Sequence, residues 1–148
     1  MLRLFSTVED GVLLHAIQRA DDVDPGRTDL CPDEEFLQVS ALRLHEGRTF
    51  RPHYHIEQHR SSDIAQESWI VVRGRVAVRL YDLDHSVLHD AVLGPGDLSI
   101  TFRRGHSYTA LDDDTLVYEY KTGPYQGQEK DKAFLEERPR EVTRADSV

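Results

Sequence analysis

The chain has 148 residues, of which 39% are hydrophobic and 30% are charged, values typical of one soluble globular domain with a proper core. Its net charge of −9 argues against a nucleic-acid backbone as a partner, and no apolar run reaches the length of a membrane span. Cys31 is the single cysteine, which excludes an internal disulfide and a thiolate cluster for zinc. We therefore expect a cytoplasmic protein without a secretory signal.

The first 45 residues are predicted to form short strands around an acidic loop. Residues 2–7 and 12–17 flank a Glu-Asp-Gly turn, which is typical of two strands joined by a tight connection. Residues 21–34 are rich in Asp with Pro-Gly at the centre, so we predict a loop there. Residues 36–45 mix aliphatic and polar side chains and are predicted to form a strand that ends at a Glu-Gly turn.

The segment 48–57 carries the main chemical signal and is also predicted to be a strand. His53 and His55 are one residue apart in it, and side chains two apart on a strand point to the same face. Both imidazoles would then project together, with Tyr54 on the opposite face. Two imidazoles held by a rigid backbone form half of a metal site. The alternative is a pair of surface histidines on a polar strand.

The remaining sequence indicates many short strands separated by turns. Residues 58–66 are predicted to be a mobile connection. In 75–81, alternation predicts that Val76, Val78 and Leu80 face inward while Arg75, Arg79 and Tyr81 face outward. Residues 129–138 have the composition of a short helix or docked tail. This pattern is typical of a β-barrel or sandwich. The strands predicted here are 67–72, 75–81, 87–93, 98–102, 107–111 and 115–121.

Two sets of residues resemble the sequence motifs of the cupins. The first motif is matched by Gly47, His53, His55, Glu67 and Gly74, and the second by Gly96-Asp97 with Gly105-His106. The resemblance covers about 36–125 and implies an all-β, double-stranded β-helix (jelly-roll) barrel. It implies a single domain over 1–148, in which 1–35 are N-terminal strands and loop, 36–125 the barrel core and 126–148 a C-terminal helix or tail.

Cupins bind a divalent metal through the motif histidines and glutamate, so the resemblance implies His53, His55, Glu67 and His106 as ligands. Fe(II) is our first choice of metal, with Mn, Ni or Zn as alternatives. Eleven residues separate His55 from Glu67, where the usual motif has three or four. A residue of the insertion 56–66 is therefore an alternative ligand to Glu67. The second motif lacks its usual proline, and Arg103 stands near that position.

Three longer segments are similar to small single-domain cupins found among bacterial surface-polysaccharide and specialised-metabolite genes. They read DIAQESWIVVRGRV, GPGDLSITFRRGH and LVYEYKTGPY, the last followed by Asp131, Lys132 and Phe134. These cupins mostly lack an assigned reaction. The similarity therefore narrows the expected fold and not the substrate.

We expect a cavity whose catalytic residues are Glu67, Tyr108 and Arg51. Alternation places Arg51 on the face of the two histidines, Trp69 on that of Glu67, and Tyr108 on that of His106. Glu67 would serve as ligand or base, and Arg51 as a clamp for a substrate carboxylate or phosphate. The alternatives are a salt bridge to Arg for Glu67, a surface salt bridge for Arg51, and an ordinary core position for Trp69.

Three functions follow from these expectations. The first is a metal-dependent enzyme on a small polar metabolite, either an oxygenase or a metal-assisted isomerase, epimerase or lyase. The second is a metal-free sugar isomerase or epimerase that uses His and Tyr as acid–base groups. The third is a non-catalytic sensor or binding module. Because Ile70 and Val72 make the outer face of 67–72 apolar too, we expect either the N-terminal strands or a second subunit in a homodimer to cover it.

Overall fold

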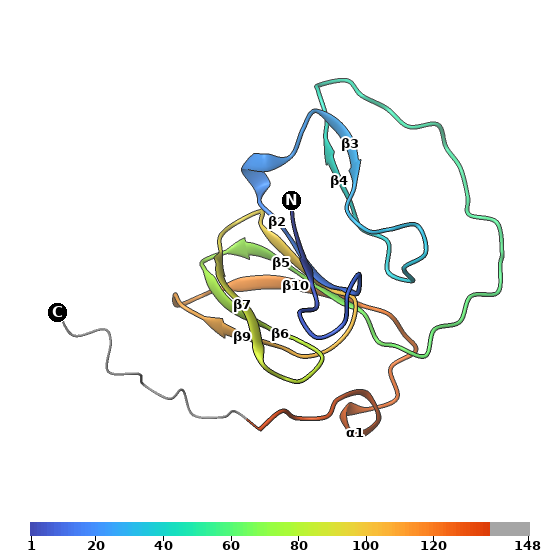
Figure 1. Cartoon of the computed structure of the whole chain (residues 1–148). Coiled ribbons are helices and arrows are strands. Elements are labelled where there is room, and N and C mark those ends of the chain that lie inside the picture. The colour runs from blue at the N-terminus through green and yellow to red at the C-terminus, as the bar shows by residue number, and fades with distance from the viewer. Residues whose placement is uncertain (137–148) are drawn as a thin grey trace.

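The computed structural model describes residues 1–136, and its regular structure consists mainly of antiparallel strands (Figure 1). The predicted all-β class is confirmed. The strands are β1 (Leu2–Phe5), β2 (Leu13–Gln18), β3 (Gly26–Asp29), β4 (Ser40–Arg43), β5 (Glu67–Arg73), β6 (Val76–Tyr81), β7 (Val87–Leu93), β8 (Leu98–Thr101), β9 (His106–Ala110) and β10 (Leu116–Lys121). Two short helices complete the elements, η1 (Ala20–Asp22) and α1 (Gln128–Asp131).

Two sheets pack face to face around a shared apolar core. The five-stranded sheet has the order β1-β2-β8-β5-β10, and the three-stranded sheet has the order β7-β6-β9. Alternate side chains of each strand point to the common interior, as the period of two requires. They form one buried cluster from both sheets, which includes Ile17, Val71, Val78, Leu80 and Leu93.

The outer face of the five-stranded sheet is covered by residues 30–41. Leu30 and Cys31 pack there with Ile100 and Phe102, both of which are fully buried. Ile70 of β5 packs against the same cluster, whereas Val72 remains 41% exposed. Ile70 is therefore covered within the chain by residues 30–41, of which only 30–35 belong to the predicted N-terminal region, and the homodimer stays a prediction.

The strands predicted after residue 66 are confirmed to within one or two residues at each end. The prediction for Tyr81 is wrong, because its side chain is buried rather than outward. A β-bulge between Leu80 and Tyr81 shifts the register and breaks the alternation at the end of β6. The sequence also predicted no strand within 21–34, where β3 pairs with β4. The helix is one turn long, and positions 137 and 138 of the predicted 129–138 lie outside the described residues.

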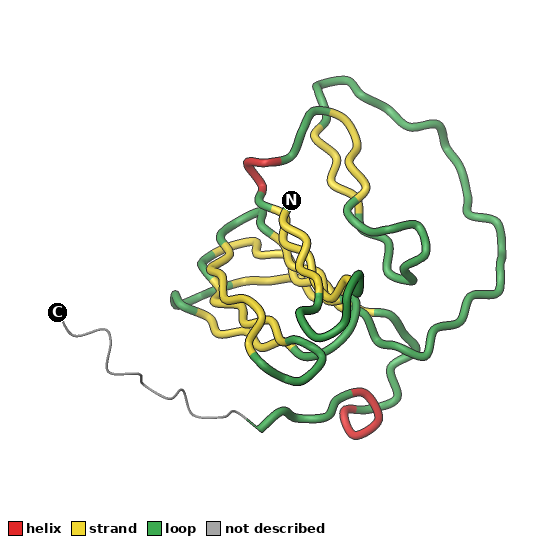
Figure 2. Tube along the Cα trace, in the orientation of Figure 1, coloured by secondary structure: helices red, strands yellow, loops and turns green. Residues whose placement is uncertain are grey.

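The prediction of a strand at 48–57 is wrong. Residues 44–66, which we call the arm, have no regular structure beyond a turn at 46–47 and bends at 63–64, and they run outside the sheets in Figure 2. His53, His55 and their neighbours from Arg48 to Ile64 are all exposed. The physical reason is the missing neighbour, because a strand needs an adjacent strand to bond its backbone and a face to bury.

Candidate functional site

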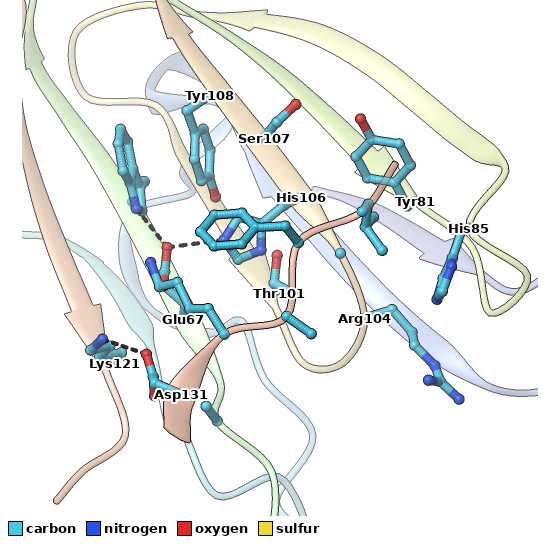
Figure 3. Close-up of a pocket in the computed structure, with 17 residues that line it drawn as sticks. Glu67, Tyr81, His85, Thr101, Arg104, His106, Ser107, Tyr108, Lys121 and Asp131 are labelled. Atoms are coloured by element: carbon cyan, nitrogen blue, oxygen red, sulfur yellow. Dashed lines mark hydrogen bonds and ion pairs between the residues drawn. The ribbon is translucent and has the colours of Figure 1, made fainter. Parts of the chain in front are cut away.

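A cavity of about 590 Å³ lies where the inner faces of the two sheets meet the C-terminal segment (Figure 3). Its volume is in the range of small-molecule sites. Glu67 and Trp69 of β5 line it together with His106 and Tyr108 of β9. Further lining comes from Thr101, Arg104, Lys121 and the residues of 131–135.

Glu67 is the centre of the polar contacts in this cavity. Its Oε1 lies 3.1 Å from Nε2 of His106 and 2.7 Å from Nε1 of Trp69, so both N–H groups donate to the same carboxylate oxygen. The Trp69 N–H also reaches Oε2 of Glu119 at 3.2 Å. This arrangement fixes the orientation of the carboxylate and leaves Oε2 of Glu67 as its second acceptor.

The Glu67 carboxyl is ionised at neutral pH. Burial would raise its pKa, but the hydrogen bond and positive charge from His106, the bond from Trp69 and the charge of Lys132 outweigh burial, so its pKa is lowered. Nε2 of His106 donates to this carboxylate, so Nδ1 is the ring nitrogen without that contact. That Nδ1 is buried and has no hydrogen-bond partner among the described residues.

An aromatic pair forms the wall beside this carboxylate. The rings of Trp69 and Tyr108 stack with centroids 4.0 Å apart and planes 8° apart. The Tyr108 hydroxyl lies 2.9 Å from Oγ of Ser99, and burial raises the pKa of this phenol above its usual value despite that bond. Tyr108 therefore remains neutral and contributes a flat apolar surface with a polar end.

Residues 131–135, which begin at the end of α1, cover the cavity, and an ion pair of Asp131 attaches them to the sheet. Nζ of Lys121 lies 2.8 Å from Oδ2 of Asp131, as Figure 3 shows. Leu135 approaches Gly105 so closely that a Cβ at that glycine would lie 2.5 Å from its Cδ1. The sequence did not predict Lys121, Asp131 and Lys132 as site residues. The sequence did mark this segment through the Asp131-Lys132-x-Phe134 similarity to small single-domain cupins, but that similarity implied no functional role for these residues.

A buried histidine forms hydrogen bonds with two residues that line the cavity. His15 is fully buried, with Nε2 2.9 Å from the Tyr81 carbonyl oxygen and Nδ1 3.1 Å from Oγ1 of Thr101. Burial lowers its pKa to about 4, and the charge of His106 acts in the same direction. Neutral His15 therefore donates a hydrogen bond from Nε2 to the Tyr81 carbonyl oxygen and accepts one at Nδ1 from the Thr101 hydroxyl. Thr101 itself lines the cavity.

The structure brings together only some of the predicted site residues. Glu67, His106 and Tyr108 line one cavity, and Trp69 is a wall of it, as the alternation predicted. Arg51, His53 and His55 lie on the exposed arm, where Nδ1 of His53 bonds the Arg51 carbonyl oxygen at 2.8 Å. Converging strands therefore do not assemble the predicted site within one chain.

The expected metal ligands lie in two places: His53 and His55 are exposed on the arm, and Glu67 and His106 line the cavity. Across residues 1–136, no three His, Cys, Asp or Glu side chains gather in a way that would hold a metal. The alternative ligands of the insertion 56–66, among them Glu57 and His59, are exposed on the arm as well. Metal binding stays a prediction of the sequence.

Comparisons of the chain with protein-family models, with curated proteins and with solved structures each find no match. None of the helices in the described part of the chain has the length and apolar character to cross a membrane. The fold and the cavity therefore define the class of protein only as far as an all-β protein with a small-molecule-sized site.

Proposed function

We propose that this protein is an enzyme of cupin type, with a jelly-roll barrel, that moves a proton on a small polar metabolite bound in the Glu67–His106 cavity. The observation that carries the proposal is the carboxylate–imidazole contact of 3.1 Å inside a cavity of about 590 Å³. Paired titratable groups in a cleft are the usual composition of acid–base sites. The reaction class is that of an isomerase or epimerase.

The aromatic wall supports a hydroxylated, sugar-like substrate. Trp69 and Tyr108 present stacked rings next to a carboxylate, so a ring with one apolar face and several hydroxyls would contact both. Lys132 places a positive charge close to Glu67. That charge would stabilise the negative oxygen that develops when a proton leaves the carbon next to a carbonyl.

Glu67 is the proposed base. With Oε1 occupied by the N–H groups of His106 and Trp69, Oε2 takes the proton from the substrate carbon, and the electron pair moves to the carbonyl oxygen as an enolate. Return of the proton from Oε2 to the neighbouring carbon, with the adjacent hydroxyl proton moving to the enolate oxygen, completes an isomerisation. Return of the proton to the original carbon, after the enolate has turned its other face to Oε2, completes an epimerisation. His106 keeps the carboxylate oriented throughout. The proposed steps involve no metal ion.

One observation favours a second candidate, a binding module that does not turn its ligand over. The pKa of Glu67 is lowered, whereas an efficient general base has a pKa near the working pH. A carboxylate that stays ionised and fixed is well suited to accept hydrogen bonds from ligand hydroxyls.

Solvent exchange distinguishes these two candidates. The protein is incubated in D₂O with a panel of keto-sugars, aldo-sugars and 2-oxo acids. We expect it to catalyse deuterium incorporation next to the carbonyl of at least one of these compounds, and proton NMR measures this exchange. Glu67→Gln should slow this exchange by about 100-fold or more while keeping ligand binding. Glu9→Gln, in an exposed turn, is the control and should exchange normally. Ligand-dependent thermal stabilisation without exchange would favour the binding module. If the panel produced neither exchange nor stabilisation, both candidates would be refuted.

Metal analysis tests the metal-dependent alternative expected from the sequence. Protein purified without chelators would carry a stoichiometric metal under that alternative, and His53→Ala would lower the occupancy sharply while the sheets still fold. Exchange activity that persists in metal-free protein would support the proton-transfer function instead. Cytoplasmic location also stays a prediction.

A further inference from the structure

The arm has the side-chain pattern of a two-faced strand, although no strand among residues 1–136 pairs with it. Phe50, Tyr54 and Ile56 occupy alternate positions, and they are 55%, 87% and 77% exposed. The intervening positions are polar or basic, among them Arg51, His53 and His55. Exposing three large apolar side chains at alternate positions of one segment is unfavourable, and such patches mark interaction sites.

A sheet edge with the same two-faced pattern is free to receive it. β10 is the outermost strand of its sheet, and among residues 1–136 it pairs only with β5. On its outer face, Leu116, Tyr118 and Tyr120 alternate and are 38%, 54% and 55% exposed. Its other face carries Glu119, whose carboxylate contacts Trp69 at the cavity wall.

We propose that the arm of one copy of this chain adds as a strand to the β10 edge of a second copy, so that a homodimer exchanges its arms. Strand addition at an open edge satisfies the backbone groups of both segments. The apolar side of the arm then extends the face of Tyr118 and Tyr120, while Arg51, His53 and His55 lie on the face of Glu119. Each cavity is thereby completed at its mouth by basic side chains of the other copy.

Proline and charge both agree with this docking. Within a strand, the amides of alternate residues point to the same edge, so Pro52, which has no N–H, requires that its side of the arm face solvent. Residues 51, 53 and 55 then bond to β10. Residues 48–60 hold three arginines and one glutamate in a chain of net charge −9, and Asp113, Asp114 and Glu119 are exposed at or beside β10. Opposite charges thus meet across the proposed contact.

A second copy is favoured over the same chain because the arm lies away from the β10 edge of its own sheet. In Figures 1 and 2 the arm runs outward, away from both sheets, before it returns at β5. A reciprocal exchange gives a closed two-fold assembly in which both arms and both edges are used. The proposal is independent of whether Glu67 transfers a proton, because its readout is assembly rather than activity.

Light scattering after size exclusion tests the assembly. We expect the native chain to elute with twice its mass of 17.0 kDa, and Phe50→Asp with Ile56→Asp to elute as a folded monomer. Val8→Asp is the matched control, because Val8 is 56% exposed in the turn before β2 and should leave the dimer intact. A monomeric native chain, or an arm variant that remains dimeric, would overturn the proposal.

Disulfide trapping tests the partner and the contact, and it does not depend on the aspartate variants. Tyr54→Cys and Tyr118→Cys are co-expressed on chains with tags of different length and oxidised, while Cys31 is buried and unreactive. Docking predicts a mixed disulfide dimer that neither variant forms alone. A chain carrying both substitutions that closes an internal disulfide instead would show that the arm folds back on itself, and absence of any cross-link would contradict the contact.

Discussion

The sheets at residues 67–121 and the arm at 44–66 have similar strand-forming side chains and different structures. Val71 and Val78 are buried because each lies on a strand with a bonded neighbour and a covered face. Phe50 and Ile56 alternate in the same way, but no strand of the described residues pairs with their segment, and they are exposed. Alternation alone therefore does not define a strand, since the pairing edge must be available too.

The largest difference between the two regions is expected when one phenylalanine in each is truncated to alanine. Phe102 is fully buried against Leu30 and Ile100, whereas Phe50 is 55% exposed. We expect Phe102→Ala to lower the free energy of unfolding by about 3–5 kcal/mol, because it leaves a cavity in the core. Phe50→Ala should change it by less than about 0.5 kcal/mol in dilute solution, where assembly does not contribute.

Urea titration monitored by circular dichroism measures both values at one low protein concentration. Equal losses from the two substitutions would mean that the arm packs as part of the same core. That outcome would contradict the structural difference between the regions.

A smaller effect is expected from His15, which connects the two sheets with the cavity. The pKa of His15 is lowered to about 4 in the folded chain. Between pH 6.5 and 4 this imidazole therefore binds a proton in the unfolded chain and stays neutral in the folded chain. Stability is therefore lost as the pH falls through this window, by about 3 kcal/mol at its lower end. The carboxyl groups of Glu67 and Asp82, which also have lowered pKa values, add further losses mainly below it.

Urea titrations at intervals between pH 7 and 4 measure this loss. His15→Gln should flatten the dependence above pH 4, and His45→Gln, at an exposed position, should leave it unchanged. A native slope that survives in His15→Gln would show that another group is responsible.

The sequence predicted the sheets well because their pattern is local. Val76, Val78 and Leu80 alternate inward between turns at Gly74 and residues 82–86, and turn chemistry fixes where such strands end. The exception at Tyr81 arises from a bulge, which depends on how β6 and β7 pair and leaves no mark in composition.

The site was predicted in part, and the difference again lies in pairing. Glu67, Trp69, His106 and Tyr108 lie on paired strands, so alternation placed them on the correct inner faces. His53 and His55 also alternate, but their position depends on which edge the arm joins, and that contact is remote in sequence or lies in another copy. The cover at 131–135 was missed because its contacts are few and depend on tertiary structure.

The C-terminal cover is intermediate between the buried sheets and the exposed arm, and loosening it is expected to have only a small effect on global stability. Its attachment is the Lys121–Asp131 pair, whose side chains are 20% and 15% exposed, together with the contact of Leu135 at Gly105. We expect Asp131→Asn to cost at most about 1 kcal/mol of global stability, as partly solvated ion pairs do. Local opening of the segment should increase much more clearly than global unfolding, because the segment belongs to neither sheet. Amide hydrogen exchange of 128–135 measures that opening, with Asp113→Asn, in an exposed turn, as the charge-matched control. Unchanged exchange in Asp131→Asn would mean that Leu135 alone holds the cover over the cavity.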